Sequence, residues 1–447
     1  MPEASQKVEE GAALYLSESA HGAELLLQNL DLWTAATRKK STSGRGGGGK
    51  IELAGIKKLR ELILELAVRG KLVPQDPSDE PASELFDRIQ SEKNTLIADG
   101  KAKKGKSYPQ ITKIEEPYTL PKGWVWARAG QLGVIKGGKR VPKGFSLTKE
   151  PTSHVYIRVT DMKDQTVRLN ELHYITDEVY EVIKKYTISA KDIYITIAGT
   201  IGAVGTIPDE LDGMNLTENA AKIWIPIVSK NWLVVALSSN TTQNYFTESV
   251  NQQAQPKLAL RMIEGLVLGL PPVNEQHRIV AKVDELMALC DQLEQQTESQ
   301  LEAHQQLVES LLGTLTSAQS AEELATHWQR LAEHFDLLFS GPMGEWAVDR
   351  LKDTILQLAV MGKLVPKDPS EEPTSELLER IQEEKARLIA EGKLKKQKPL
   401  LPISEEEMPF ALPGGWSYAR ITELGEFSGG KTPSKTQSKY WGGQIPW

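Results

Sequence analysis

The sequence predicts a mixed α/β fold, in which an α/β domain is flanked by helical regions and a long coiled-coil helix, all within an internal duplication. Three observations lead to this prediction. A segment of helical pattern recurs at a fixed offset, a run of short β-rich segments lies between the copies, and a long helical stripe follows that run. A chain of 447 residues with 40% hydrophobic content is long enough for more than one core.

The internal repeat is the most specific of these features. Residues 59–104 and 351–396 align without a gap at an offset of 292 and match at 31 of 46 positions. The same offset joins LPKGWVWARAGQLGVIKGGK, from Leu120, to LPGGWSYARITELGEFSGGK, from Leu412, with 11 of 20 positions identical. A period this long indicates a duplicated module with its own domain in each copy, not a solenoid of short repeats.

Each copy of the repeat predicts a pair of helices. In the first copy the apolar spacing predicts a helix that ends at Gly70, because glycine is a common helix stop and three prolines follow. A second helix is expected from Ser83 to about Ala98. We therefore assign residues 1–117 to an N-terminal helical region with a basic linker, and residues 56–100 within it to the helix pair.

The next segment changes from helical to strand periodicity. Short runs rich in Val, Ile and Tyr predict strands, namely VYIRV, YTIS, DIYITIA, AKIWIPIV and LVLGL. Helices are expected at Asp177–Lys185 and near Trp232–Glu248. Residues 118–272 are therefore predicted to form a mixed α/β domain.

A long helix is predicted after the α/β domain. Its apolar residues recur at steps of four and three, at Ile279, Val283, Leu286, Cys290 and Leu293, and resume at Leu307 and Leu311. Such a stripe needs a partner helix. We assign residues 273–409 to a central helical region that contains the second helix pair, and residues 410–447 to the start of a second α/β domain in which the chain is cut short.

Charge is unevenly distributed along the chain. The formal net charge is −7, which argues against a protein that coats nucleic acid in general. Residues 118–272 nevertheless carry 17 Lys and Arg against 14 Asp and Glu. The basic bias is strongest where this domain begins, and a local basic strip on an acidic frame is the expected arrangement.

Several protein classes are excluded by composition. The one cysteine, Cys290, rules out a disulfide framework. Neither a secretory signal nor an apolar run of about 20 residues is present, so a cytoplasmic protein without a membrane segment is expected.

Motifs for catalysis are incomplete. The glycine-rich segment GRGGGGK is followed by Ile51 instead of the hydroxyl residue of a phosphate-binding loop, and no strand precedes it. The segment Leu270-Pro271-Pro272-Val273 has the prolines of an amino-methyltransferase motif without its amide or aromatic group. The histidines are scattered, with no metal-binding spacing. We interpret the chain as non-enzymatic, with no metal site and no cofactor of its own.

The repeated KLVPxDPxxEPxSELxxRI, the LPxGW that precedes each α/β domain, the GGK after it and the exit LPPVNEQHRIVAKVDELMALCDQLE resemble the specificity subunits of type I restriction-modification systems. The long N-terminal helical region is most similar to the subgroup of the EcoAI and EcoEI enzymes. The resemblance identifies the α/β domain as a target recognition domain and the helical segments as conserved regions.

The resemblance implies a function. Each of two target recognition domains in this family reads one half of a split double-stranded DNA site, and paired helices fix the spacing between the halves. The helical regions dock two methyltransferase subunits and, through them, restriction subunits, and these partners use S-adenosylmethionine, ATP and Mg²⁺. A chain truncated in the second domain would lack the usual mate of its long helix, and self-association of two such chains is one hypothesis.

Specific DNA binding needs cations for phosphates and hydrogen-bonding side chains for base edges. The basic strip supplies the first kind on a loop that contains glycines. Arg158 is suited to guanine and Asp161 to the amine of cytosine, and the remaining polar candidates lie in turns and loops between strands. The candidate DNA-binding residues are Lys136, Lys139, Arg140, Lys143, Arg158, Thr160, Asp161, Thr200, Asn215, Asn219, Gln253 and Lys257.

Other interpretations stay open at this point. Polar residues and glycines also occupy turns for local reasons, so each loop candidate has a purely structural explanation. The chain as a whole could be a methyltransferase or nuclease with an unrecognised site, or a coiled-coil adaptor that binds no DNA. Loss of DNA affinity with salt separates a DNA-binding protein from the adaptor.

Overall fold

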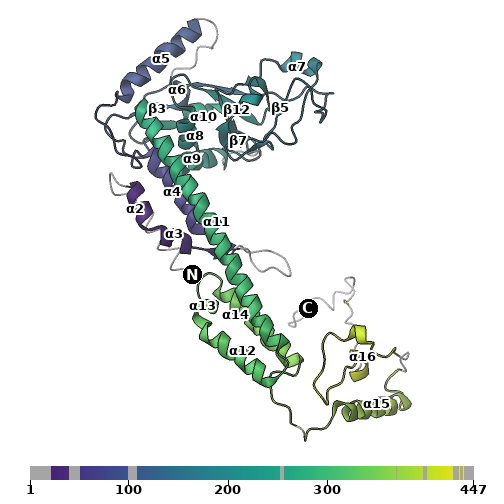
Figure 1. The fold of residues 1–447 in the computed structure, drawn as a ribbon. Coiled ribbons are helices and arrows are strands. Elements are labelled where there is room, and N and C mark those ends of the chain that lie inside the picture. Colours follow the sequence, from purple (N-terminus) through teal and green to yellow (C-terminus); the bar gives the residue numbers. More distant parts are fainter. Residues whose placement is uncertain are drawn as a thin grey trace. The chain divides into compact units, whose positions relative to one another are not determined.

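The computed structural model describes residues 22–39, 51–98, 108–251, 256–368, 370–395, 400–425, 432 and 436. The chain divides into two compact units, residues 1–299 and 300–447, whose elements are labelled in Figure 1. Among the helices of the described residues, none has the length and apolar character needed to cross a membrane. Mixed α/β architecture with a long helix, as the sequence predicts, is confirmed.

Unit 1 holds a helical region followed by an α/β domain. The helical region consists of α2 (Gly22–Gln28), α3 (Leu30–Ala35), β1 (Arg38–Lys39), β2 (Ile51–Glu52), α4 (Ala54–Val68) and α5 (Ala82–Ala98). The α/β domain consists of β3 (Val125–Arg128), α6 (Ala129–Leu132), β4 (Val134–Gly137), β5 (Tyr156–Ile157), β6 (Met162–Lys163), β7 (Thr166–Val167), α7 (Asp177–Ile183), β8 (Thr187–Ile188), β9 (Ile193–Thr196), β10 (Val204–Thr206), η1 (Asp209–Leu211), β11 (Met214–Leu216), β12 (Ala220–Trp224), α8 (Lys230–Ser238), α9 (Asn240–Asn251), α10 (Leu260–Gly265) and β13 (Val267–Leu270).

The long helix and the second copy of the repeat follow. Their elements are α11 (Val273–Ser317), α12 (Ala321–Glu333), α13 (Phe335–Phe339), α14 (Gly344–Val360), α15 (Thr374–Ala390), η2 (Glu405–Glu407) and α16 (Ile421–Leu424).

Helix α4 ends where its sequence predicts. Gly70 has a φ of +63°, and Lys71 N–H donates to the carbonyl of Leu66 at 2.9 Å, which closes the last turn. A Cβ at position 70 would lie 2.4 Å from Pro121, so the close approach of the LPKGW segment also requires glycine. The second helix begins at Ala82, whose N–H donates to Gly123 O at 2.9 Å. The repeat motif therefore holds the helix pair against the first residues of the α/β domain.

The α/β domain contains a four-stranded sheet of order β10-β9-β12-β4 and a three-stranded sheet of order β5-β11-β8. Strand β12 is antiparallel to both neighbours, with Ala220 opposite Thr196 and Ala221 opposite Gly137. Strand β13 pairs with β3 and so brings the end of the domain back to its start. Each run predicted as a strand contains one, while β3, β4, β6, β7, β10 and β11 were not predicted.

One predicted helix in this domain is interrupted. The expected helix over Trp232–Glu248 is wrong as a single element, because α8 ends at Ser238 and α9 begins at Asn240. Ser239 is extended, and its hydroxyl donates to Ala236 O at 2.9 Å while lying 3.3 Å from the hydroxyl of Thr242. Serine competes in this way with backbone hydrogen bonding, which breaks the helix between two apolar stretches.

Helix α11 begins directly after Pro272, as predicted. In unit 1 the stripe of Ile279, Val283, Leu286 and Cys290 is buried. Arg60 of α4 donates to Asp291 at 2.7 Å and to Glu294 at 2.8 Å, so α4 lies against this part of α11. Burial raises the pKa of the Cys290 thiol to about 11, so this cysteine is an apolar core residue.

In unit 2 the end of α11 has a different phase. Leu307 is 42% exposed, which corrects the prediction that it continues the stripe. Val308, Leu312 and Leu315 are buried instead, in a cluster with residues of α12, α13 and α14. Helices α12, α13 and α14 of the same chain therefore pack against this part of the long helix, and the expectation that its usual mate is missing stays a prediction.

The second helix pair repeats the hydrogen bonds of the first. Thr374 N–H donates to Gly415 O at 2.9 Å, as Ala82 does to Gly123 O, and Gly362 has a φ of +67°. Lys385 Nζ donates to carbonyls at the end of α16, and Lys93 Nζ does the same at the end of α6. The duplication seen in the sequence is therefore a duplication of local structure.

Candidate nucleic-acid interface

Loops that carry most of the candidate residues meet at one edge of the α/β domain. Strands β4 and β9 end at this edge, and β12 begins there, because β12 is antiparallel to both. Strands β5 and β11 run parallel and end at the same edge, since Lys139 N–H donates to Leu216 O at 2.9 Å and Thr217 N–H to Ile157 O at 3.1 Å. We call this surface the polar edge. It comprises residues 136–143, 158–161, 185–186, 198–202, 217–219 and 257–258.

Backbone hydrogen bonds join these loops. The N–H groups of Ile197 and Ala198 both donate to Asn219 O, at 2.8 and 3.2 Å, and Leu258 N–H donates to Ile197 O at 2.9 Å. Gly138 lies so close to the next loop that a Cβ there would be 2.1 Å from Thr217 O. Side chains from distant parts of the sequence are thereby brought to one surface, on backbone that is already fixed.

Lysines provide the uncommitted positive charge of the polar edge. Lys136, Lys139, Lys143 and Lys257 are exposed, and none of them forms an ion pair within the described residues. Lys139 Nζ lies 5.6 Å from the centre of the Tyr186 ring, a cation-π contact. Lys136 lies in strand β4 and not on a loop, which corrects the predicted position of this residue. These ammonium groups are free to contact phosphate oxygens.

Arg140 is held by a carboxylate of the neighbouring loop. Its Nε donates to Glu218 Oε1 at 2.6 Å, and Glu218 Oε2 accepts from the hydroxyls of Tyr156 and Thr217, both at 3.1 Å. Burial acts to raise the pKa of Glu218, but the hydrogen bonds from Arg140, Thr217 and Tyr156 outweigh it and hold the pKa below its ordinary value. The pair fixes the loop of Arg140 to the turn before β12.

Arg158 and Asp161 bind each other. Nε and Nη2 of Arg158 donate to the two carboxylate oxygens of Asp161 at 3.1 and 2.6 Å, Nη2 also donates to Glu171 O at 3.2 Å, and Nη1 lies 3.2 Å from His173 Nε2. Asp161 is only 5% exposed. The expectation that both side chains face bases is corrected: the bidentate pair shapes the turn, and Thr160 between them is the exposed group.

Asn215 lies in the interior of the domain. It belongs to strand β11 and not to a loop, it is 1% exposed, and its Nδ2 donates to Ile183 O at 3.0 Å. Its position in the middle of the three-stranded sheet, beside Tyr156 and Thr187, removes the side chain from the surface. The prediction of a DNA contact at Asn215 is therefore wrong for this structure.

The remaining polar candidates lie at the surface of the polar edge. Thr200 is exposed at the turn that joins the antiparallel strands β9 and β10, as predicted. Asn219 is half-buried, and Lys257 is exposed beside the turn that follows β9. Gln253 lies outside the described residues.

Lys185 and Tyr186 belong to the polar edge and are suited to DNA contact, but neither was among the predictions. Lys185 is exposed just after α7, and Tyr186 O accepts from Leu216 N–H at 3.0 Å, which places both beside Lys139. Their signal in the sequence was a pair of lysines followed by an aromatic residue, a pattern that is interpreted as the end of a solvated helix unless the sheet order is known.

The exit motif starts at the end of β13 and continues into α11, and its side chains hold the end of the domain in place. Trp124 Nε1 donates to Glu275 Oε2 at 2.9 Å, and Gln276 accepts from Ser229 N–H and donates to Pro271 O, both at 2.9 Å. Trp124 is 6% exposed and lies in the core. The exit motif therefore links the end of the domain to Trp124 near its beginning and to Ser229. In the described part of the chain no cluster of His, Cys, Asp and Glu side chains has a metal-binding arrangement.

Comparison with known proteins identifies a family and several relatives. Residues 121–303 match the type I restriction modification DNA specificity domain. The chain is 44% identical to the EcoAI specificity subunit of Escherichia coli over 422 residues, which is 91% of this chain and 69% of that protein. It is 42% identical to the EcoEI specificity subunit of the same organism, over 90% of this chain and 67% of that protein.

Solved structures of related systems are more distant. The chain is 16% identical to the HsdS subunit from Thermoanaerobacter tengcongensis, with a TM-score of 0.30, over 56% of this chain and 54% of that one. The two Escherichia coli relatives carry the assignment, since both are more than 30% identical and the chain covers two thirds or more of each. The chain belongs to the specificity subunits of type I restriction-modification systems, the non-catalytic DNA-recognition components, in the group that includes EcoAI and EcoEI.

Proposed function

We propose that the α/β domain, residues 118–272, is the first target recognition domain and that it binds one half of a split DNA site through the polar edge. The observation that carries the proposal is the convergence on one surface of uncommitted lysines, the exposed hydroxyls of Thr160 and Thr200 and the half-buried amide of Asn219. Cations position a protein on phosphates, and hydrogen-bonding groups at fixed places distinguish bases.

The residues of the polar edge fall into two roles in this proposal. Lys136, Lys139, Lys143 and Lys257 contact phosphates, and Lys185 extends the same surface. Thr160, Thr200 and Asn219 face base edges, and the role of Gln253, which lies outside the described residues, stays a prediction. Arg140, Arg158 and Asp161 support the loops through the ion pairs described above.

The helical regions serve as docking sites and as a spacer. We propose that residues 1–117 and 273–409 bind two methyltransferase subunits and, through them, restriction subunits, and that residues 410–447 begin a second recognition domain. A helix rises 1.5 Å per residue, and in this proposal the 45 residues of α11 supply the length of the spacer between the two half-sites. S-adenosylmethionine, ATP and Mg²⁺ belong to the partner subunits in this proposal, and this chain binds none of them.

Salt dependence of DNA binding tests the phosphate role. We expect Lys139→Ala to weaken binding to all sequences and to make the slope of log affinity against log salt less steep by about 0.9, the contribution of one phosphate contact. Lys191→Ala is the matched control, because Lys191 is exposed at the opposite end of β9 from the polar edge. An equal change in slope for both variants would show that the polar edge is not the binding surface.

Self-association is tested separately by light scattering of the chain at micromolar concentration. Dimers would support pairing of two chains, and monomers alone would exclude it.

A further inference from the structure

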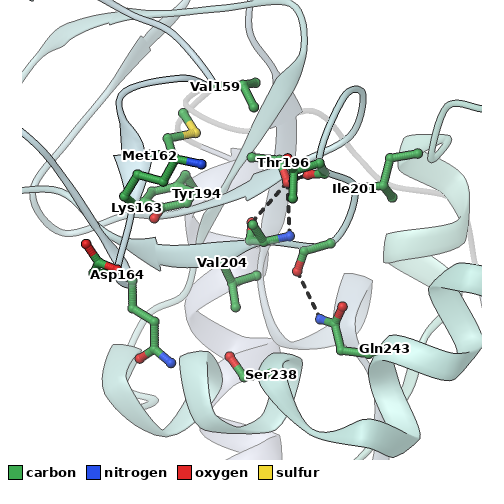
Figure 2. A pocket seen from close by; sticks show the side chains of 14 residues that line it. Val159, Met162, Lys163, Asp164, Tyr194, Thr196, Ile201, Val204, Ser238 and Gln243 are labelled. Carbon is green, nitrogen blue, oxygen red and sulfur yellow. Dashed lines mark hydrogen bonds between the residues drawn. The ribbon is translucent and has the colours of Figure 1, made fainter. Parts of the chain in front are cut away.

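One side chain of α9, that of Gln243, is hydrogen-bonded to the turn between β9 and β10. Gln243 Nε2 donates to Gly202 O at 2.9 Å, the bond drawn from Gln243 in Figure 2, and to Leu237 O at 2.7 Å, so a single amide joins the turn to the end of α8. Gly202 has a φ of +85°, and a Cβ there would lie 2.7 Å from Gln243 Oε1. The turn is therefore in direct contact with the side chain of Gln243.

The turn is also braced from within. Thr196 Oγ1 accepts from Ala203 N–H at 2.9 Å and donates to Thr200 O, and Gly202 N–H donates to Thr196 O at 2.9 Å. Beside the turn lies an open pocket of about 450 Å³, lined by Thr196, Ile201, Val204 and Gln243 among others (Figure 2). Gln243 lines this pocket and links the turn to α9, in addition to the hydrogen bonds within the turn.

The beginning of α9, which carries Gln243, is hydrogen-bonded to the helical region. Glu65 of α4, which is 6% exposed, accepts from Thr241 N–H at 3.2 Å and from Thr241 Oγ1 at 2.5 Å, at the beginning of α9. Arg69 Nε donates to the same carboxylate at 2.8 Å. A carboxylate beside the first N–H groups of a helix stabilises that end. A continuous path of contacts thus leads from α4 through Thr241 and Gln243 to the turn that carries Thr200.

We infer that Gln243 is a positioning residue for DNA specificity: it does not contact DNA, and it places the β9–β10 turn so that Thr200 meets the correct base. This inference rests on the proposed function of the polar edge. Side chains that read bases must be held within a fraction of an ångström, because hydrogen bonds weaken steeply with distance and angle. Loss of the two hydrogen bonds from Gln243 should therefore reduce discrimination between sequences without removing any charge that contacts phosphates.

The test measures affinities of the full chain for its cognate site and for a site with one changed base pair, after the site has been identified. Gln243→Met keeps the length of the side chain and removes both N–H donors, while Gln243→Ala removes the side chain. Both are expected to lower the cognate-to-mismatch ratio about tenfold and to leave the salt dependence unchanged. Asn244→Ala, at an exposed neighbour on α9, is the control and should keep the wild-type ratio.

A double variant makes the test specific to the turn. If Gln243 acts through Thr200, the combination of Gln243→Met with Thr200→Ala should lose no more discrimination than Thr200→Ala alone. An unchanged ratio in folded Gln243→Met, or additive losses in the double variant, would overturn the inference. A wild-type chain without salt-dependent DNA binding would instead contradict the proposed function, so the two failures are distinguishable. Melting temperatures of all variants show whether they are folded.

Discussion

The two copies of the repeat have the same local structure and differ in what covers them. Gly70 and Gly362 adopt the same left-handed conformation, and Ala82 and Thr374 make the same backbone hydrogen bond. Leu85 is completely buried, whereas Leu377, its counterpart, is 44% exposed. In the first copy the α/β domain lies on the helix pair. The comparison shows that the repeat encodes its own helices and turns, while burial comes from the domain that follows.

The LPxGW segment shows the same contrast. Trp124 is 6% exposed and Trp416 is 46% exposed, although each follows the same turn. Trp124 has a partner in Glu275, from the exit motif of the α/β domain. In the described part of the chain the Trp416 ring has no such hydrogen bond. The hydrogen bond to Glu275 of the exit motif is therefore one contact that distinguishes the first tryptophan from the second.

The largest expected difference between the copies concerns these leucines. Leu85→Ala is expected to lower the free energy of unfolding of its unit by about 2–5 kcal/mol, because it leaves a cavity in a packed interior. Leu377→Ala is expected to cost under about 1 kcal/mol, since the side chain is partly in solvent. Urea unfolding of both variants beside wild type measures the difference. Equal losses would mean that another surface buries Leu377 in solution.

The two tryptophans should differ by a smaller amount. Trp124→Phe removes the donor to Glu275, a carboxylate that is 2% exposed, and is expected to cost about 1–3 kcal/mol. Trp416→Phe is expected to change stability by no more than about 0.5 kcal/mol. Thermal unfolding measures both, and Glu275→Gln is the control because it keeps an acceptor for the indole. A similar cost for both tryptophan variants would contradict the contrast between the copies.

The third comparison concerns two glutamates at equivalent positions, Glu115 in the first copy and Glu407 in the second, and we expect no difference between their pKa values. The pKa of Glu115 is lowered to about 2, first by the N–H of Thr112 and then by Arg128, and the pKa of Glu407 is lowered to about 2 by Arg420 and Ser404. Because the folded pKa values lie below the ordinary value of 4.5, the stabilisation is present above pH 4.5 and is lost as the pH falls toward 2.

Carbon-13 NMR titration of the two carboxyl groups checks this third comparison. Titration of both carboxyl groups at similar low pH would confirm that their lowered pKa values depend only on the local structure of each copy. A normal pKa at Glu407 beside a low one at Glu115 would show that the covering domain contributes.

Much of the fold was predictable from local patterns. The helix pair, the stop at Gly70, the strand runs and the start of the long helix follow from periodicity, glycine and proline, and the repeat supported the helix pair and its glycine stop a second time. Strand β4 was not predicted, because its Lys136 and glycines mimic a loop until pairing with β12 is known. The end of α11 was assigned the wrong phase because its partner helices were not identified in the sequence.

The polar edge was predictable in part. Residue types suited to DNA indicated Lys139, Thr160 and Thr200, which lie at the surface. The same reasoning included Asn215 and Asp161, which are buried and form hydrogen bonds inside the domain. Whether a polar residue faces solvent depends on the order of the strands and on partners that are distant in sequence. Gln243 and Gly202 are such partners. The periodicity of a sequence does not contain this information.

Selection of bound sequences from random DNA tests the central claim most directly. The wild-type chain should enrich one short element. Thr160→Ala or Thr200→Ala should change the preferred base at single positions of that element, whereas Lys139→Ala should weaken binding and leave the element unchanged. If the element is enriched identically by all four proteins, or if no element is enriched by the wild-type chain, the polar edge does not read DNA.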